Sequence, residues 1–86
     1  MTNEQRQTII NEVIMNCMMK LKSEIIELEQ QKQPLIDLSI EIHLKYGSRN
    51  KLTRESIRNS NQIQNRIHDK KLELSELFIQ YNHTKN

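Results

Sequence analysis

The sequence predicts an all-α protein built as a long helical hairpin. Three observations lead to this fold class. The 86 residues include one Gly and one Pro, too few for the frequent turns of an all-β fold. Only 3% of the residues are aromatic, so the core must be built from aliphatic side chains. Apolar residues also recur at spacings of three and four in two separate segments, which is typical of helices that pack side by side.

The first segment, residues 3–33, has the clearest helical pattern. From Ile14 onward its apolar stripe advances in alternating steps of four and three, as in a coiled coil. Thr2 or Asn3 is suited to cap the start of this helix. The stripe consists of Ile10, Ile14, Cys17, Met18, Leu21, Ile25 and Leu28, and it is widened by Ile9, Val13, Met15, Met19 and Ile26.

The stretch 36–46 allows two interpretations, because it alternates apolar and polar residues as a half-buried strand does. A strand of ~11 residues would have no partner within the chain and would need a second molecule. We therefore expect a helix with two apolar ridges, and we keep an intermolecular strand, which would make the fold α+β, as the alternative. Pro34 fits either a kink or the first turn of a new helix, so the segment 34–45 continues the first helix or restarts as a third one.

The rest of the chain predicts a turn, a second helix and a tail. The turn covers 46–52 and contains Gly47, which can adopt the left-handed conformation that ends helices. A helix follows over 53–81 with Thr53 as its N-cap, and a frayed tail over 82–86 ends the chain. The stripe of this helix consists of Ile63, Ile67, Leu74, Leu77, Phe78 and Tyr81, with Ser56, Ser60 and Lys70 at positions that an ideal core would fill with apolar residues.

The chain, residues 1–86, is expected to be one domain whose two arms differ in length. A continuous first helix would extend beyond the second and leave an apolar stripe uncovered at its N-terminal end. Such a surface is prone to aggregation, so we expect a second molecule to cover it. The sequence therefore predicts coiled-coil-like packing and self-association to a dimer or larger species, through Ile10, Ile14, Met18 and Leu21.

Nothing in the sequence predicts a catalytic, cofactor-binding or metal site. The three histidines, His43, His68 and His83, do not stand at the spacings of metal ligands. Cys17 lies within the apolar stripe, where we expect a small buried side chain and not a reactive thiol. A single glycine leaves no Gly-rich phosphate loop. We therefore expect no enzyme.

Basic residues are concentrated between positions 49 and 71, although the net charge of the chain is only +2. Several of them are expected on roughly one helical face, opposite the apolar stripe. A basic helical face is typical of proteins that contact phosphate backbones. The candidates for contact with nucleic acid or an acidic partner are Arg49, Lys51, Arg54, Arg58 and Arg66.

About half of the chain resembles a family of small regulators. The run LIDLSIEIHLKYG followed by ESIRNSNQIQNRI is similar to the helical-hairpin aspartyl-phosphate phosphatases that regulate sporulation in bacilli. Those proteins carry a Ser-Gln-Glu-Leu-Asp motif on the second helix, and the nearest match here is SNQIQ, residues 60–64. The essential Asp of the family falls on Gln64, the turn is longer and the N-terminal helix is extra. The resemblance implies a helical hairpin, and without the acid it implies no phosphatase activity.

These observations predict a non-enzymatic protein–protein interaction module, such as a regulator, an inhibitor or an assembly adaptor, that acts through an apolar helical face. The alternative is a nucleic-acid-binding protein that uses the basic face of residues 49–71. The expected partners are the chain itself and another protein. A membrane is not expected, because no apolar segment approaches the ~20 residues that cross a bilayer. A cytoplasmic location is expected, because a single cysteine permits no internal disulfide and the N-terminus lacks a signal-peptide pattern.

Overall fold

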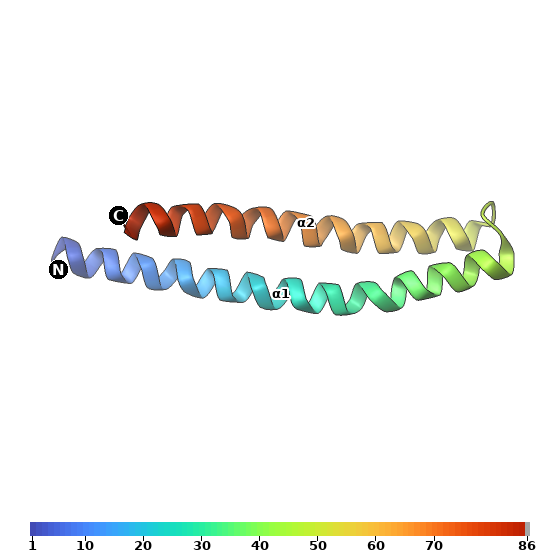
Figure 1. Cartoon of the computed structure of the whole chain (residues 1–86), viewed down its shortest axis with the longest axis horizontal. Helices are drawn as coiled ribbons and strands as arrows, with labels where there is room; N and C mark the ends of the chain where they lie inside the picture. Colours follow the sequence, from blue (N-terminus) through green and yellow to red (C-terminus); the bar gives the residue numbers. More distant parts are fainter. Residues whose placement is uncertain (86) are drawn as a thin grey trace.

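The chain forms an antiparallel hairpin of two long helices (Figure 1). The computed structural model describes residues 1–85. Helix α1 spans Asn3–Tyr46 and helix α2 spans Lys51–Lys85, with a short turn over 47–50 between them. The hairpin measures 65 × 16 × 15 Å, so it is about four times as long as it is wide. The predicted all-α helical hairpin is confirmed.

The alternating stretch 36–46 is helical, and no strand occurs within residues 1–85. Helix α1 runs through Pro34 without a break, so neither a third helix nor an intermolecular strand forms. Pro34 lies on the exposed surface, where water can bond to the carbonyl of Gln30 that a proline leaves without its helical donor. Figure 1 shows α1 curving gently over its middle part, so the proline is absorbed by bending.

A single seam of buried and half-buried residues holds the two helices together. In each helix the seam advances in alternating steps of three and four, the repeat of a coiled coil. Its apolar centre is Ile67, which is 2% exposed and clusters with Ile25 and Leu28, while Ile63 and Leu74 pack against them. The seam consists of Gln7, Asn11, Ile14, Met18, Leu21, Ile25, Leu28, Lys32, Leu35, Ser39 and Ile42 from α1, and of Thr53, Ser56, Ser60, Ile63, Ile67, Lys70, Leu74, Leu77 and Tyr81 from α2.

Toward the turn the seam becomes small and polar. Ser39, Thr53 and Ser56 are all buried there. The Ser39 hydroxyl donates to the carbonyl of Leu35 at 2.9 Å, and the Ser56 hydroxyl donates to the carbonyl of Thr53 at 2.8 Å. Because each hydroxyl keeps a hydrogen bond, its burial costs little, but it also adds little hydrophobic stabilisation. The apolar part of the seam therefore lies away from the turn.

Three side-chain and backbone contacts define the turn. Gly47 has φ 86° and ψ 167°, and its N–H donates to the carbonyl of His43 at 2.8 Å. The Thr53 hydroxyl donates to the carbonyl of Gly47 at 2.7 Å. The Asn50 side-chain oxygen accepts from the N–H of Leu52 at 2.8 Å, as an N-cap does. Asn50 therefore takes the capping role expected of Thr53, and α2 begins two residues earlier than predicted.

The far ends of the helices also differ from expectation. Helix α2 continues to Lys85, so the residues expected to fray are helical as far as the structure describes them, and Asn86 lies outside the described residues. The longer α2 covers more of α1 and shortens the predicted overhang, which Figure 1 shows as a small projection at the N-terminus. Thr2 caps α1 as predicted, in a capping box with Gln5.

Changing Gly47 to Ala tests the turn. The backbone at this residue lies in a region of φ and ψ that only glycine adopts readily, and a Cβ added there would meet no atom within 4 Å. The cost is therefore conformational, and we expect the free energy of unfolding to fall by about 1–3 kcal/mol. Chemical denaturation followed by circular dichroism measures it, with Ser48→Ala as the control in the same turn. Equal stability of Gly47→Ala and the unmodified chain would contradict this backbone conformation.

Candidate interaction surfaces

The hairpin exposes more surface than a compact protein of its mass. Its accessible area is 6922 Å², whereas a compact monomer of 10.3 kDa is expected to expose about 5,400 Å². Its radius of gyration is 19.4 Å, compared with about 12 Å for a compact domain of this length. A two-helix hairpin has one seam, and every other side of each helix remains accessible. Candidate sites must therefore be sought on the outer faces.

The residues predicted to carry self-association do not form a free surface. Ile14, Met18 and Leu21 are buried in the seam, where α2 covers them within the same chain. The prediction that they contact a second molecule therefore does not follow from an uncovered stripe, because the register set by Leu28 and Ile67 places all three against α2. Ile10 alone of the four remains exposed, at 46%.

Exposed and half-buried apolar side chains form a series along one side of the hairpin, which we call the apolar flank, while Ile10, Val13 and Leu38 are exposed on the opposite side. Each of its α1 residues directly follows a seam residue, so these residues repeat the three-and-four spacing one position later. Phe78 and Ile79 line a groove of about 390 Å³ that is floored by Met18 and Leu74. The apolar flank consists of Met15, Met19, Ile26, Ile36 and Ile40 from α1, and of Ile57, Phe78 and Ile79 from α2.

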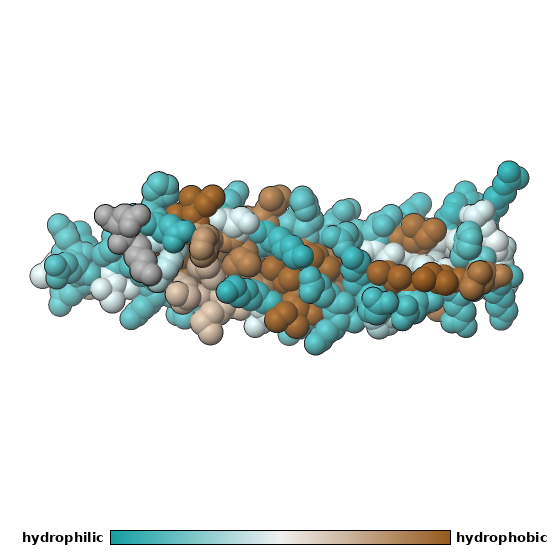
Figure 2. Space-filling model, in the orientation of Figure 1, coloured by the Kyte–Doolittle hydropathy of each residue, from teal (hydrophilic) through white to brown (hydrophobic). Residues whose placement is uncertain are grey.

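A second groove on the same flank lies near the turn, where Ile40 and Leu44 of α1 meet Ile57 of α2. Figure 2 shows apolar surface in two areas of one face: a broad one over both helices in the half nearer the termini, and a narrow row toward the turn. Between the grooves, Lys71 forms an ion pair with Glu29 at 3.4 Å, and Lys32 donates to the side-chain oxygen of Gln64. The flank is thus two apolar patches separated by polar contacts.

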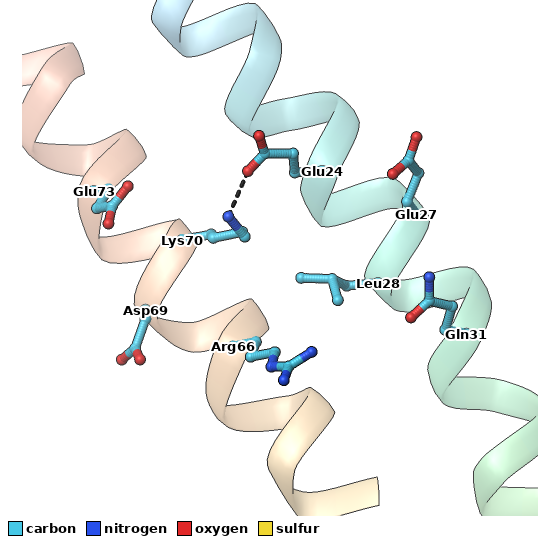
Figure 3. Close-up of a pocket in the computed structure, with 8 residues that line it drawn as sticks. All are labelled: Glu24, Glu27, Leu28, Gln31, Arg66, Asp69, Lys70 and Glu73. Carbon is cyan, nitrogen blue, oxygen red and sulfur yellow. Dashed lines mark hydrogen bonds and ion pairs between the residues drawn. The ribbon is translucent and has the colours of Figure 1, made fainter.

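The opposite side of the hairpin, which we call the charged flank, has a different character. A groove of about 570 Å³ lies there between the helices (Figure 3). The Lys70 ammonium donates to the Glu24 carboxylate across it. That hydrogen bond is the main reason why the pKa of Glu24 is lowered and the pKa of Lys70 is raised, while partial desolvation opposes both changes. The charged residues of this groove are Glu24, Glu27, Arg66, Asp69, Lys70 and Glu73.

The predicted basic face is divided between two places. Arg66 lines the groove of the charged flank, and Figure 3 shows its guanidinium directed toward α1, near Leu28 and Gln31. It therefore does not share a face with the remaining bases, which are exposed at and just after the turn. Lys51 forms an ion pair with Glu55 at 3.9 Å. We call the remaining group the basic end: Arg49, Lys51, Arg54 and Arg58.

Other candidate sites offer less chemistry. Cys17 is exposed, not buried as predicted, because it lies beside the seam residue Met18 and not in the seam. Among residues 1–85, no group of three or more His, Cys, Asp and Glu side chains is arranged to hold a metal ion. Neither helix, as far as it is described, has a stretch apolar enough to cross a membrane.

Gln64 occupies the position that corresponds to the essential Asp of the sporulation phosphatases. Its side chain accepts a hydrogen bond from Lys32, and it has no carboxylate to offer a phosphoryl group. No protein-family model, curated protein or solved structure matches the chain.

The apolar flank was not anticipated as a contact surface, although the sequence contains a signal for it. Ile36 and Ile40 lie in the stretch 36–46, which was expected only to form a helix with two apolar ridges, and Ile57 was not singled out. A second series with three-and-four spacing, displaced by one residue from the seam, is the pattern that identifies the flank. It becomes visible only once the seam has been assigned along the whole length of α1.

The ion pair across the charged flank should give stability a pH dependence. The pKa of Glu24 is lower in the folded chain than in the unfolded chain, so its contribution is complete above about pH 4.3 and is lost as the pH falls through the folded pKa. The raised pKa of Lys70 acts only in alkali, where its contribution is lost above about pH 10.4. We expect Glu24→Gln to lower the thermal midpoint at pH 6 and to reduce its further decline between pH 6 and pH 3.

Glu27→Gln is the matched control, because Glu27 lines the same groove without an ion pair among the described residues. Thermal unfolding followed at 222 nm over this pH range measures both variants. Identical acid profiles for Glu24→Gln and the unmodified chain would contradict the role of the ion pair.

Proposed function

We propose that this protein is a non-enzymatic protein–protein interaction module that binds helical segments through its apolar flank. The observation that carries the proposal is the exposure of large apolar side chains in a regular series. Met19, Ile26 and Ile40 are each more than half exposed on α1, as is Phe78 on α2. From Met15 to Ile40 the series extends over ~38 Å of helix. Exposed apolar patches of this kind mark interaction sites.

The spacing of the flank specifies the kind of partner. Residues that recur every three and four positions along a helix form ridges into which the side chains of another helix can interdigitate. The two grooves beside Phe78 and Ile57 add the hollow between two helices that receives an amphipathic helix. An extended peptide would have no sheet edge to pair with among the described residues. A partner helix with apolar residues at i, i+3, i+4 and i+7 fits this surface.

Photo-cross-linking from the apolar flank tests the proposal. A photoreactive residue at Met19 should capture a specific protein in cells, whereas one at Asp69 on the charged flank should not. The captured protein, once identified and purified, should bind the unmodified chain with an affinity that changes little with salt. It should bind the Ile26→Asp variant at least about tenfold more weakly, because a carboxylate would be buried without a partner.

Circular dichroism of Ile26→Asp checks that the fold survives, which we expect because Ile26 is 55% exposed. Equal capture from Met19 and Asp69, or unchanged binding by Ile26→Asp, would contradict the use of the apolar flank.

Nucleic-acid binding remains the second candidate function, and the basic end is the observation that favours it. Arg49, Arg54 and Arg58 are exposed and form no ion pair among the described residues. Four bases at one end of a rod can contact only a few phosphates, so we expect weak, sequence-independent binding. The location of Arg66 among acids removes one predicted contact from this surface.

A salt titration separates the two functions. Each phosphate contact contributes about one unit to the slope of log affinity against log salt, so Arg54→Gln with Arg58→Gln should make the slope shallower by up to about two units. Arg66→Gln is the control on the charged flank and should leave the slope unchanged. The measurement is fluorescence anisotropy of a labelled DNA duplex at several salt concentrations. Sub-micromolar, sequence-dependent binding that the double variant abolishes would make nucleic acid the principal partner.

A further inference from the structure

We infer that the apolar flank binds a second copy of this chain, with the two α1 helices antiparallel about a two-fold axis between Glu27 and Leu28. This inference rests on the proposed function and names the partner of the same surface. In this arrangement, residues at equal distances on either side of that point face each other across the interface. The argument comes from which residues this symmetry brings together.

On α1 the symmetry pairs apolar residues with apolar residues. Met15 of one copy faces Ile40 of the second copy, and Met19 faces Ile36, and each pair occurs twice because of the two-fold axis. The polar positions of the series also face each other: Lys22 faces Gln33, which is uncharged. The broad apolar area near the termini of one copy therefore covers the narrow apolar row near the turn of the other, the two areas visible in Figure 2.

The charges on this face are compatible with the same register. Glu12 of one copy faces His43 of the second copy at the edge of the contact, where an imidazole N–H can donate to the carboxylate. Ile26 faces Glu29, whose carboxylate is already paired with Lys71 of its own chain at 3.4 Å. No two like charges of the α1 series oppose each other. Electrostatics thus favours this register over one that brings bases or acids together.

The positions of the apolar residues on α2 also fit this two-fold axis, although the axis was chosen from α1 alone. Leu28 packs with Ile67, so the point between Glu27 and Leu28 lies level with the point between Ile67 and His68 on α2. Ile57 and Phe78 are equally distant from that second point, on opposite sides of it. The axis chosen from α1 alone therefore brings Ile57 of one copy level with Phe78 of the other, and these two carry the grooves of the apolar flank.

Other registers and the other flank are less complementary. Moving the axis by one repeat toward the N-terminus places Met15 against Gln33 and Met19 against Glu29, so both methionines lose their apolar partners. The equivalent antiparallel contact on the charged flank would bring Glu24 of one copy against Glu27 of the other, twice. Like charges in a closed contact are strongly unfavourable.

The surface area is sufficient for a stable dimer. A standard interface buries about 800 Å² on each partner. The hairpin exposes 6922 Å², roughly 1,500 Å² more than a compact monomer of its mass. Covering one of its long sides would remove enough area, and that side already carries the large apolar residues.

Cysteine cross-linking tests the register, in a Cys17→Ser background because Cys17 is exposed. A mixture of a Met19→Cys chain and an Ile36→Cys chain should form a disulfide-linked dimer under mild oxidation. Neither chain alone should do so, because two copies of position 19 would lie ~25 Å apart, far beyond the reach of a disulfide. Cross-linking of either chain alone would indicate a parallel contact. Preferential cross-linking in a mixture of a Val13→Cys chain and a Leu38→Cys chain would indicate that the dimer forms through the other flank. Either result would overturn the inference.

Sedimentation equilibrium tests the association itself. Ile40→Asp should raise the dimer dissociation constant about a hundredfold or more, because the two-fold axis buries two unpaired carboxylates. Val13→Asp is the control and should leave the constant unchanged, because Val13 directly precedes the seam residue Ile14 and so lies on the side opposite the apolar flank. Its exposure matches that of Ile40, at 56% and 54%. A chain that is monomeric at millimolar concentration overturns the inference. If that monomer still binds the captured protein through Met19 and Ile26, the proposed function stands without it.

Discussion

The contact of Ile67 with Ile25 and Leu28 is the interaction on which the rest of the hairpin depends. It fixes the register of one helix along the other. Polar contacts on both sides of this apolar contact reinforce the register: Lys70 bonds to Glu24 on one side, and Lys32 bonds to Gln64 on the other. A shift by one helical turn would place these lysines beside the wrong residues and leave their charges without partners. Polar residues within an otherwise apolar seam thus fix the register at some cost in stability.

This register determines which residues of each helix lie on the outer surface and on which side of the hairpin. Because each helix has one side in the seam, the residues next to the seam form two flanks, and the sequence gives the two flanks opposite characters. The apolar flank follows from aliphatic residues placed one position after the seam residues, as Met19 follows Met18 and Ile26 follows Ile25. The charged flank carries the acids and bases of the central groove. The exposed apolar side chains are in this way separated from the side chains that hold the two helices together.

The helices and their pairing could be predicted from the sequence, because three-and-four spacing is a local pattern with a direct structural meaning. The stretch 36–46 misleads for a physical reason. Its apolar residues at every second position point to all sides of a helix, and Ile42 alone of them belongs to the seam. The start of α2 could not be fixed, because Asn50 and Thr53 are both good capping residues and only the packed turn buries Thr53.

The candidate surfaces were less predictable than the fold. How much of α1 is covered depends on the register between the two helices, which the turn constrains. In the observed register Leu28 packs with Ile67, and Ile14 and Met18 lie in the seam against α2. The position of Arg66 has a different cause, which lies within α2. At 3.6 residues per turn, Arg66 lies about 120° around the helix from Arg54, so the two side chains leave different sides of α2. Only the location of Ile14 and Met18 concerns the relation between the helices, which no single segment encodes.

The small, polar seam near the turn has a consequence for the way the chain folds. In many hairpins the contacts closest to the turn form first, because they close the shortest loop. Here those contacts join Gly47, Thr53 and Ser56 and bury almost no hydrocarbon. The contact nearest the turn that buries much apolar surface is Leu28 with Ile67. The entropic cost of closing that loop of ~40 residues is about 1.5–2 kcal/mol greater than the cost of closing a loop of about six. We therefore expect the two helices to form individually and then to dock near their middles, with the turn end ordering last and opening most often in the native state.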